Sequence, residues 1–428
     1  MPDRPATYYV ETLGCPKNQV DSDKLEGTLV ADGLHAVGDA SAADLLVVNT
    51  CAFVEEARQE SIDTILTLSE QRRPGARLVV TGCLAERYGQ ELAAELPEVD
   101  TVAPFGASVL AGLDPASNGS TVPVALGATR RRPDFDLLNL PRPASPRPWA
   151  YVKIAEGCDR ACGFCAIPSF RGPQRSRSIE QILGEVEQLA VREVVLVAQD
   201  LAAYGRDQGV GERQIVPLIE QVSAVVDRVR LLYLYPSDLN EALIDAVLAS
   251  GTPYFDLSLQ HVSAPLLRRM RRWGDGERFL DRIVAIRERS PEAAFRSNFI
   301  VGYPGETESD HDALLDFVDA AQLDWCGFFA YSPEAGTHAV TLDGEVPAGL
   351  RDERLAELRE RQDQITETKR DLLVGQRVEV LVDEPGVGRS HREAPEIDGV
   401  MLVPDHLAVG EFHQLTVTAA VGADVEAS

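Results

Sequence analysis

Short apolar segments alternate with helical patterns through two long stretches of this chain of 428 residues. Alternation of this kind predicts parallel sheets, because two parallel strands need a long crossover between them, which is usually a helix. In the first stretch the expected strands are Tyr8–Leu13, Leu45–Val48 and Leu78–Val80. In the second stretch the expected strands are Tyr151–Ile154, Val194–Val197, Leu231–Tyr235, Phe255–Leu259, Phe295–Val301 and Cys326–Ala330. Six such units predict an open or partial (β/α) barrel whose active site lies at the carboxyl ends of its strands.

The chain as a whole reads as an α/β protein with three domains. We expect an N-terminal parallel α/β sheet domain over residues 1–105 and a proline-rich linker over 106–148. A central partial (β/α) barrel is expected over 149–350, and a charged connecting helix over 351–371. Residues 372–428 contain short alternating segments with turns between them, which predicts a small antiparallel β-barrel.

Three cysteines directly follow the first predicted strand of the central barrel. Cys158, Cys162 and Cys165 have C-x-x-x-C-x-x-C spacing, and the aromatic Phe164 precedes the last of them. Three close thiolates suit an iron–sulfur cluster that needs four ligands, so one iron would keep no protein ligand. That iron can bind a substrate or a cofactor, and the motif therefore predicts a catalytic cluster. The alternative is a structural zinc site that lacks one ligand, although such sites usually show paired cysteines and a fourth ligand.

A second set of cysteines lies in the N-terminal domain. Cys15, Cys51 and Cys83 each follow one of its predicted strands. Because the carboxyl ends of parallel strands share one edge of the sheet, we expect these three thiols to converge there. They predict a second cluster site, and the alternative is three buried cysteines without a shared ligand, which is common for free cysteine. The seventh cysteine, Cys326, lies in an apolar strand, and packing is its expected role.

The overall charge limits the partners that the chain can bind. It carries 41 basic and 68 acidic residues, a formal net charge of -27. Nucleic-acid binding depends on neutralising phosphates, so this composition favours a basic partner, such as a ribosomal protein or a polyamine. Basic runs at Arg130–Arg132 and Arg268–Arg272 leave an RNA role disfavoured but open. The other interpretation is that the charge only keeps the protein in solution.

The sequence shows no membrane or export signal. No apolar run is long enough to span a bilayer, and the start Met-Pro-Asp-Arg-Pro lacks the apolar core of a signal peptide. A cytoplasmic protein is therefore expected. Cysteines stay reduced in that compartment, which favours metal ligation over disulfides for the seven that are present.

Taken together, these motifs resemble the methylthiotransferases, a branch of the radical S-adenosylmethionine (SAM) enzymes, over nearly the whole chain. The segments Leu13–Asn18, Asn49–Cys51 and Thr81–Cys83 are similar to that family's N-terminal cluster motifs. The terminal barrel resembles a TRAM domain, and its segment Gly388–Gly399 is similar to the version in the branch that modifies a ribosomal protein. Ser258 departs from the family, which usually has proline at this position, and this puts the local strand geometry in question.

The resemblance implies a reaction and its cofactors. It implies two 4Fe–4S clusters and SAM, with the six cysteines of the two sets as metal ligands and catalytic residues. Cleavage of SAM at the cluster on Cys158, Cys162 and Cys165 would give a radical that abstracts hydrogen from an unactivated carbon. A sulfur held at the other cluster would be methylated by a second SAM and transferred. The residues expected to contact the cofactor are Phe164, Gln199, Gln260 and Arg296.

The resemblance also implies the partners. The substrate would be one aspartate of small ribosomal subunit protein twelve, methylthiolated on its β-carbon. The acidic composition independently favours such a basic protein over tRNA, since residues 372–428 carry three arginines against ten acidic residues. An electron donor of reductase or flavodoxin type and a sulfur donor are further implied partners, whereas no membrane and no direct tRNA substrate are expected. The alternatives are a tRNA methylthiotransferase, a non-catalytic iron–sulfur scaffold or electron carrier on the ribosome, and a radical SAM enzyme with an unrelated substrate.

Charged residues near the motifs supply candidates for substrate recognition. Arg171, Arg175 and Arg177 either receive the aspartate of the substrate or are solvated loop charges. His261 follows the fourth strand of the central barrel and is either a pocket residue or a structural one. Acidic positions of the terminal barrel that are expected to steer a basic protein include Glu393, Glu396 and Asp398.

Overall fold

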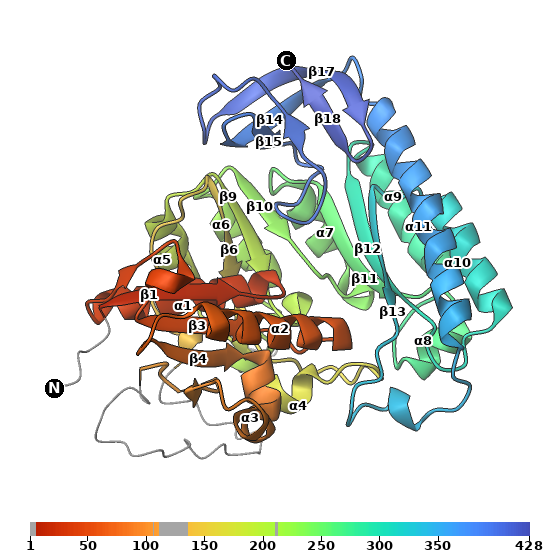
Figure 1. Cartoon of the computed structure of the whole chain (residues 1–428). Coiled ribbons are helices and arrows are strands. Elements are labelled where there is room, and N and C mark those ends of the chain that lie inside the picture. The colour runs from red at the N-terminus through yellow and green to blue at the C-terminus, as the bar shows by residue number, and fades with distance from the viewer. Residues whose placement is uncertain (1–5, 106, 111–135, 210–212) are drawn as a thin grey trace. The chain divides into compact units, whose positions relative to one another are not determined.

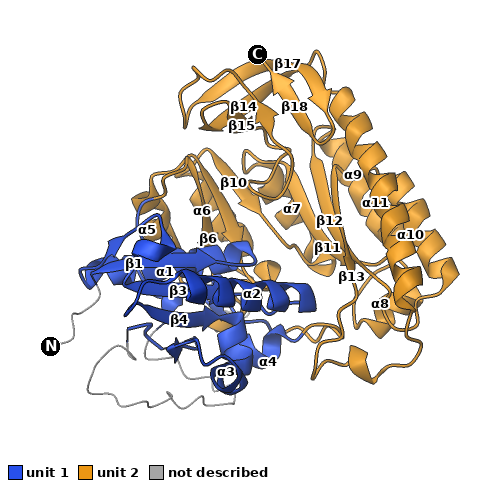
Figure 2. Cartoon of the chain, viewed as in Figure 1, with its two compact units in different colours: residues 1–144, 155–159, 166–177 blue, residues 145–154, 160–165, 178–428 orange. Residues whose placement is uncertain are grey.

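The chain divides into two compact units. The structure, a computed structural model, describes residues 6–105, 107–110, 136–209 and 213–428. The first unit, here called the N-terminal unit, contains the residues up to 144 together with 155–159 and 166–177. The second, called the barrel unit, contains residues 145–154, 160–165 and 178–428 (Figure 2). The chain therefore passes repeatedly from one unit to the other around the segment that carries Cys158, Cys162 and Cys165.

The N-terminal unit is built on a five-stranded parallel sheet with the strand order β2-β1-β3-β4-β5 (Figure 1). Its strands are β1 (Thr7–Thr12), β2 (His35–Ala36), β3 (Leu45–Thr50), β4 (Arg77–Gly82) and β5 (Thr101–Val102). Its longer helices are α1 (Pro16–Ala31), α2 (Glu55–Gln71) and α3 (Cys83–Glu95). The parallel sheet predicted from the strand–helix alternation is confirmed.

Both faces of this sheet are covered by helices, because alternate residues of a strand point to opposite sides. Leu45 and Val47 of β3 pack with residues of α1 on one face. Leu46 and Val48 pack with residues of α2 and α3 on the other face. β3 is buried along its whole length, as is typical of a central parallel strand.

Part of the proline-rich segment that the sequence predicts as a linker packs onto this unit. Leu137 lies in the core beside α1. The buried Lys24 donates from Nζ to the carbonyl of Leu138 at 2.6 Å. Residues 111–135, which include the basic run Arg130–Arg132, lie outside the described part of the chain. The described residues of this segment up to 144 belong to the N-terminal unit, so they do more than connect two domains.

The segment that brackets the cysteine motif also belongs to the N-terminal unit. β7 (Ala155–Glu156) pairs antiparallel with β8 (Arg175–Ser176), and this short clasp closes the loop between them. Within that loop α4 (Ile167–Arg171) contacts α3. Gly172 follows α4 with a φ of +75°, a conformation that glycine adopts without strain.

The barrel unit contains two three-stranded parallel sheets that together form a partial (β/α) barrel (Figure 1). One sheet consists of β6 (Trp149–Lys153), β9 (Glu193–Val197) and β10 (Arg228–Leu231). The other consists of β11 (Tyr254–Gln260), β12 (Ala294–Val301) and β13 (Trp325–Ala330). A bridge between Leu234 and Leu257 joins the two sheets. Ser258 contributes to this seam by donating its amide to the carbonyl of Leu234 at 2.9 Å, a bond that a proline at this position could not make.

Helices connect the strands of this barrel and lead to the last domain. The helices are α5 (Ile179–Leu189), α6 (Ile215–Ser223), α7 (Glu241–Leu248), α8 (Ala264–Arg269), α9 (Gly276–Arg289), α10 (Glu308–Ala321) and α11 (Ala348–Asp371). The short 3-10 helices of the two units are η1 (Ala40–Ala42), η2 (Leu137–Asn139), η3 (Leu201–Ala203), η4 (Arg206–Gln208), η5 (Pro236–Asp238) and η6 (Ala339–Thr341). Among the described residues, no helix is both long enough and apolar enough to cross a membrane.

One strand of the barrel lies earlier in the chain than expected. The sequence predicts a strand over Leu231–Tyr235, whereas β10 spans Arg228–Leu231. Arg228 and Arg230 are both buried, and Arg230 donates from Nε to Glu193 at 2.8 Å. An apolar pattern cannot reveal such a strand, because its buried positions hold charges that are paired.

The last strands close into a small barrel with the order β14-β15-β16-β18-β17. They are β14 (Arg377–Glu384), β15 (Val387–Arg389), β16 (Met401–Leu402), β17 (Phe412–Val421) and β18 (Asp424–Ala427). Four of the pairings are antiparallel, and β16 pairs in parallel with β18. The predicted small β-barrel is confirmed, with two short strands, β15 and β18, that the sequence pattern does not reveal.

The terminal barrel is tied to the partial barrel by buried ion pairs. Glu193, which is fully buried, accepts from Arg230 at 2.8 Å and from Arg389 of the terminal barrel at 3.2 Å. Burial alone would raise the pKa of Glu193, but the arginines around it lower this pKa to about 2. A second buried pair joins Arg370 of α11 to Glu393. Removing one partner of a buried pair typically costs about 3–5 kcal/mol, because the other charge is left buried and unpaired.

Candidate active site

The three N-terminal cysteines follow three neighbouring strands of the parallel sheet. Cys15 lies just beyond β1, Cys51 directly after β3, and Cys83 directly after β4. β1, β3 and β4 are adjacent in the sheet, so these cysteines share its carboxyl edge, as expected. Cys15 is the N-cap residue of α1, and Cys83 is the first residue of α3. The positive end of a helix favours a thiolate, which is the form that binds iron.

Close packing of the backbone holds this site together. Gly14 has a φ of +93°, and a Cβ added to it would lie 2.8 Å from the sulfur of Cys51. Asn18 of α1 donates from Nδ2 to the carbonyl of Leu13 at 2.8 Å and to the carbonyl of Thr50 at 3.0 Å. These bonds connect the chain after β1 with the end of β3, and Gly14 is required because a larger residue would displace Cys51.

Burial and mutual repulsion make it difficult for these thiols to ionise together in the absence of a metal. Burial and the neighbouring Cys83 and Cys15 raise the pKa of Cys51 to about 12. Burial also raises the pKa of Cys83, although Arg171 opposes this shift. At Cys15 burial acts in the same direction, but Lys17, backbone N–H donors and Arg171 outweigh it and lower the pKa of the thiol. An iron–sulfur cluster supplies the positive charge that three converging thiolates need, so the residues fit such a group.

All seven cysteines are free thiols. The described residues contain no group of three or more His, Cys, Asp or Glu side chains placed to hold a single metal ion. A four-iron cluster sets a different requirement, because each cysteine binds a different iron and the sulfurs need not meet at one point.

Arg171, the last residue of α4, lies against the N-terminal cysteine site. Its Nη2 donates to the sulfur of Cys83 at 3.1 Å and to Oδ1 of Asn18 at 3.1 Å. Its Nη1 lies 3.0 Å from Glu156 and 3.3 Å from Asp21, and its side chain is only 3% exposed. The interpretation of Arg171 as a residue that receives a substrate carboxylate is therefore wrong, because its donors are occupied inside the N-terminal unit.

The two other arginines of this segment are also held within the unit. Arg175 pairs with Asp136 at 3.2 Å and keeps about a third of its side chain exposed. Arg177 is buried. Of the three, only Arg175 presents a substantial part of its side chain to solvent, and its role in substrate binding stays a prediction.

The cysteines of the C-x-x-x-C-x-x-C motif are distributed over both units. Cys158 belongs to the N-terminal unit, where its amide donates to the carbonyl of Gly172 at 3.0 Å. The preceding Gly157 has a φ of +79°, and a Cβ added to it would collide with the carbonyl of Pro173. The first cysteine of the motif is thus fixed by the loop that the β7–β8 clasp closes.

The other two cysteines of this motif, Cys162 and Cys165, belong to the barrel unit and flank Gly163. The amide of Gly163 donates to the carbonyl of Met270 at 2.8 Å. A Cβ added to Gly163 would lie 2.9 Å from the hydroxyl of Tyr303. Gly163 is therefore enclosed by the barrel unit, which fixes the backbone between the two cysteines.

A stack of charged and aromatic side chains lies beside Cys162. The guanidinium carbons of Arg160 and Arg272 lie 3.9 Å and 3.8 Å from the ring centroid of Tyr235. Nη1 of Arg272 lies 3.4 Å from the sulfur of Cys162. Nε of Arg160 pairs with Asp200, which follows β9, at 2.5 Å. The stack places a guanidinium donor beside Cys162 of the C-x-x-x-C-x-x-C motif, here called the SAM motif because it is predicted to hold the cluster that cleaves SAM. The stack also gives the strand ends after β9 and β10 a fixed polar lining.

The four residues predicted to contact SAM lie in different places in the barrel unit. Phe164 lies within the cysteine motif, and Gln199 follows the end of β9. Gln260 ends β11 with a φ of +70°, a strained conformation for a residue with a side chain and one that clusters at functional sites. Arg296 lies near the beginning of β12, with a carboxylate 3.3 Å away on two sides. Phe164, Gln199 and Gln260 remain candidates, whereas the position of Arg296 gives its predicted role no support.

Several residues that the sequence places in a pocket or on the surface are buried instead. His261 is fully buried, its Nδ1 accepts from the amide of Ser263 at 3.1 Å, and burial lowers its pKa to about 4. These observations support a structural role. In the terminal barrel the side chains of Glu393 and Asp398 are buried and paired, so the expectation that they steer a partner is wrong. Glu396 is exposed.

Sequence reasoning missed Asn18, Tyr235 and Arg272, which contact the candidate sites. Arg272 belongs to the basic run Arg268–Arg272, which by sequence alone is a candidate for RNA contact. In the structure Arg269 and Arg272 both donate to carbonyls within the barrel unit. Asn18 lies in the segment Leu13–Asn18 that contains Cys15, so the sequence does point to it. Tyr235 and Arg272 are far from Cys162 in the sequence, and only the fold brings them beside it.

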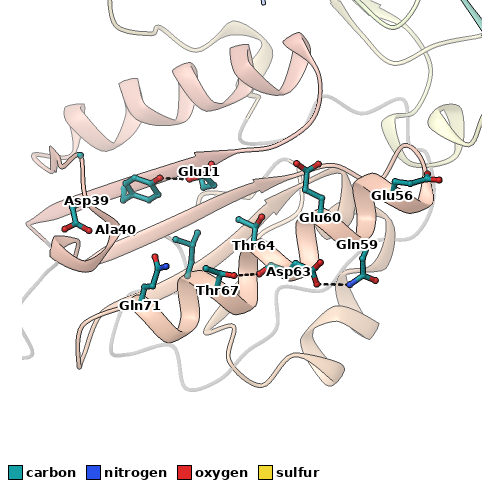
Figure 3. Close-up of a pocket in the computed structure, with 13 residues that line it drawn as sticks. Glu11, Asp39, Ala40, Glu56, Gln59, Glu60, Asp63, Thr64, Thr67 and Gln71 are labelled. Carbon is teal, nitrogen blue, oxygen red and sulfur yellow. Dashed lines mark hydrogen bonds between the residues drawn. The ribbon is translucent and has the colours of Figure 1, made fainter. Parts of the chain in front are cut away.

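A pocket of about 880 Å3 lies elsewhere in the N-terminal unit, between α2 and β1 (Figure 3). The acidic residues that line it are Glu11, Asp39, Glu56, Glu60 and Asp63. Its lining contains no cysteine, so this pocket is distinct from the candidate cluster site. It contributes a concentration of negative charge to this unit.

Comparisons with known proteins place the chain in a family. Residues 7–104 match the Uncharacterized protein family UPF0004, residues 152–318 match the Radical SAM superfamily, and residues 374–428 match the TRAM domain. The ribosomal protein uS12 methylthiotransferase RimO of Moorella thermoacetica is 43% identical over 404 residues, which cover 92% of each chain. The chain belongs to the RimO family of methylthiotransferases.

Further relatives in this family cover almost the whole chain. Proteins of the same name from Kineococcus radiotolerans and Myxococcus xanthus are 41% and 43% identical. They match 97% and 99% of this chain, and 95% and 91% of their own lengths are covered. Membership of the family makes the chain a radical SAM methylthiotransferase, an enzyme that uses SAM and 4Fe–4S clusters.

A solved structure supports the fold. The radical SAM methyltransferase TsrM of Kitasatospora setae is similar with a TM-score of 0.54 and 16% sequence identity. The match covers 76% of this chain and 74% of that chain. At this identity the likeness concerns the fold alone.

Proposed function

We propose that this enzyme transfers a methylthio group to the β-carbon of one aspartate of ribosomal protein uS12, the small-subunit protein twelve. The names of the family relatives support uS12 as the substrate. Two clusters would divide the work. The cluster for SAM cleavage would be held by Cys158, Cys162 and Cys165. The cluster for sulfur transfer would be held by Cys15, Cys51 and Cys83.

The observation that carries the chemistry is that the carboxyl ends of three adjacent strands each carry a free thiol, in a segment of the chain separate from the SAM motif. An unactivated C–H bond offers no acidic proton to a base, and the bound cofactors supply the radical chemistry that such a bond requires. The protein contributes position and charge. Gly14 and Asn18 fix the backbone at Cys15, and Gly163 fixes it between Cys162 and Cys165.

Exposed charge on the terminal barrel supports a basic protein as the substrate. Of its three arginines, Arg377 is exposed, Arg392 is half-buried and donates to the carbonyl of Glu292, and Arg389 is buried in an ion pair. The exposed acidic residues of the terminal barrel are Glu379, Glu384, Glu396, Asp405, Glu411 and Glu426. A barrel that gripped tRNA would present lysines and arginines to the phosphates. This surface repels phosphate and attracts a basic protein.

The acidic pocket of the N-terminal unit adds negative charge that would also attract a basic protein. Asp39, Glu56, Glu60 and Asp63 of this pocket are exposed. Summed surface charge of one sign raises the rate of encounter with an oppositely charged partner. We include in the proposal a cytoplasmic location, an electron donor of reductase or flavodoxin type and a separate sulfur donor, which the chemistry requires.

Mass spectrometry of both candidate substrates tests the proposal. The reconstituted enzyme is incubated anaerobically with SAM, a reductant and either uS12 or unmodified tRNA. We expect a methylthio group on one aspartate of uS12 and none on tRNA. Modification of tRNA with uS12 unchanged would establish the tRNA methylthiotransferase alternative. Modification of neither, with SAM still cleaved, would point to an unrelated substrate.

Charge reversal on the terminal barrel tests how the substrate is recruited. Changing Glu384, Asp405 and Glu411 to Lys should weaken uS12 binding several-fold, and more strongly at low salt, because exposed charges are screened by ions. The control is the same charge change on the exposed face of α11, at Glu360, Asp363 and Glu367. Equal weakening by both sets would show that net charge alone attracts uS12. Unchanged binding in both would remove the electrostatic part of the proposal.

A further inference from the structure

We propose that Arg171 is a positioning residue for the N-terminal cluster, which it serves by donating to the sulfur of Cys83 and raising the reduction potential of that cluster. The inference rests on the proposed function, in which Cys83 is a cluster ligand. It assigns to Arg171 a role that differs from substrate binding and from plain packing.

The first support is the geometry of the donor. Nη2 of Arg171 lies 3.1 Å from the sulfur of Cys83 and, in the same orientation, 3.1 Å from Oδ1 of Asn18. Asn18 is itself fixed by its bonds to the chain after β1 and to the end of β3. The guanidinium is thus held at the cysteine by a residue of the cluster motif and not by a flexible contact.

The second support is the enclosure of the guanidinium. Its central carbon lies 3.7 Å from the ring centroid of Phe105, and only 3% of the side chain is exposed. An arginine side chain stays protonated in proteins, and Glu156 and Asp21 both contact this guanidinium, so its positive charge is retained. In a site with little water, a charged donor acts more strongly on a sulfur than it would at the surface.

The third support is the division of contacts between the two ends of the guanidinium. Glu156 and Asp21 both contact Nη1, at 3.0 Å and 3.3 Å, whereas Nη2 faces Cys83 and Asn18. The two carboxylates hold the guanidinium in place and oppose the effect of its charge on the cluster. They also predict the sign of a second experiment, because removing one of them should increase the effect of Arg171 on the cluster.

Hydrogen bonds to the sulfurs and nearby positive charge are established ways in which a protein sets the potential of an iron–sulfur cluster. Reduction adds negative charge to the cluster, and a donor with positive charge stabilises that charge. Arg171 should therefore make the N-terminal cluster easier to reduce than it would be with a neutral residue at this position.

The test uses a chain in which Cys158, Cys162 and Cys165 are changed to Ala, so that the remaining cluster is the N-terminal one. Redox titration followed by electron paramagnetic resonance gives its midpoint potential. In this background Arg171→Gln should shift the potential to a more negative value, and Arg171→Lys should shift it less. Asp21→Asn should shift it in the opposite direction. Arg175→Gln is the matched control, because Arg175 pairs with Asp136 and should leave the potential unchanged.

The outcomes separate this inference from the proposed function. If the background chain binds no cluster, the assignment of Cys15, Cys51 and Cys83 fails. If it binds a full cluster and Arg171→Gln leaves both the potential and the spectrum unchanged, the role of Arg171 is overturned. If Arg171→Gln fails to assemble a cluster, Asp21→Asn decides, since an unchanged or more negative potential in that variant would also overturn the role.

Discussion

Each of the two cysteine sets consists of three free thiols, but the sets are assembled in different ways. Cys158, Cys162 and Cys165 lie within one loop, whose backbone is fixed by glycines and by hydrogen bonds of neighbouring residues. The N-terminal set draws one cysteine from each of three strand–helix units, and only the order β1-β3-β4 in the sheet brings them to one edge. In the loop, the short spacing of the three cysteines along the chain is enough to keep them close together. A site built on a sheet depends on the register and order of the whole sheet.

The arginines at the two sites differ in how their charges are paired. Arg171, at Cys83, is buried and paired with two carboxylates of its own unit. Arg272, at Cys162, stacks on Tyr235 and donates to the carbonyl of Ser258, and it forms no ion pair with a carboxylate in the described part of the chain. The charge of Arg171 is therefore opposed by two carboxylates, whereas in the stack beside Cys162 the carboxylate of Asp200 pairs with Arg160 and not with Arg272.

The largest effect is expected from removing the loop set, which is the name used here for Cys158, Cys162 and Cys165. A chain with Cys158, Cys162 and Cys165 changed to Ala should lose all cleavage of SAM and about half of its iron, because each cluster holds four irons. Formation of 5′-deoxyadenosine, measured by chromatography, and iron content per chain report both losses. If this variant still cleaves SAM, the assignment of SAM cleavage to Cys158, Cys162 and Cys165 is wrong.

Removing the sheet set, which consists of Cys15, Cys51 and Cys83, should separate radical formation from sulfur transfer. A chain with Cys15, Cys51 and Cys83 changed to Ala should still form 5′-deoxyadenosine, because the SAM motif lies in a different part of the chain. It should form no methylthiolated uS12. The two products are measured in one reaction, and a normal yield of modified uS12 would show that these cysteines are structural.

A smaller effect is expected from the arginine at the SAM motif. Arg272→Gln should slow the cleavage of SAM by about tenfold or more, because a hydrogen bond to a charged group contributes about 1.5–3 kcal/mol. Arg272→Lys should recover part of the rate. Arg268→Gln changes the same charge at a nearby exposed position and should leave the rate unchanged.

This measurement also sharpens the comparison between the two arginines. Arg171→Gln should leave SAM cleavage close to normal, because the cysteine that Arg171 contacts is Cys83, which belongs to the other set. Equal losses of SAM cleavage in Arg171→Gln and Arg272→Gln would contradict the assignment of the two arginines to different cysteine sets.

The smallest effect is expected from a single methyl group at the sheet site. Gly14→Ala should lower the iron content of the N-terminal cluster, because the added Cβ would lie 2.8 Å from the sulfur of Cys51. Gly33→Ala is the control: Gly33 has a similar φ of +88° but open space around it. Both variants should lose about 1 kcal/mol of stability from backbone strain, and only Gly14→Ala should lose iron. Equal iron contents would show that the site can move to accept the methyl group.

The sequence predicts those parts of the fold in which apolar residues are buried. The strands around Val47 and Val79 and the strand–helix alternation of the barrel follow from apolar patterns, and so does the position of each cysteine after its strand. It fails where buried positions hold paired charges. β10 is displaced because Arg228 and Arg230 are inside, held by carboxylates that come from distant segments.

The same cause explains the errors at the candidate sites. Arg171, Glu393 and Asp398 are ionic by sequence and were therefore expected at the surface, but each is buried against partners that only the folded chain supplies. Local spacing brings together Cys158, Cys162 and Cys165, and the predicted strand ends bring together Cys15, Cys51 and Cys83. The charged neighbours that set their properties come from long-range contacts, and no short pattern reveals them.

The distribution of the cysteine loop between the two units has a consequence for the order of synthesis. The N-terminal unit is complete only when residues 155–159 and 166–177 are present, since they supply the β7–β8 clasp, α4 and Arg171. Domains generally fold as they emerge from the ribosome, N-terminal end first. Here the first 144 residues emerge without the cation that contacts Cys83. The nascent chain therefore cannot complete the surroundings of Cys83 until it has also made Cys158, Cys162 and Cys165.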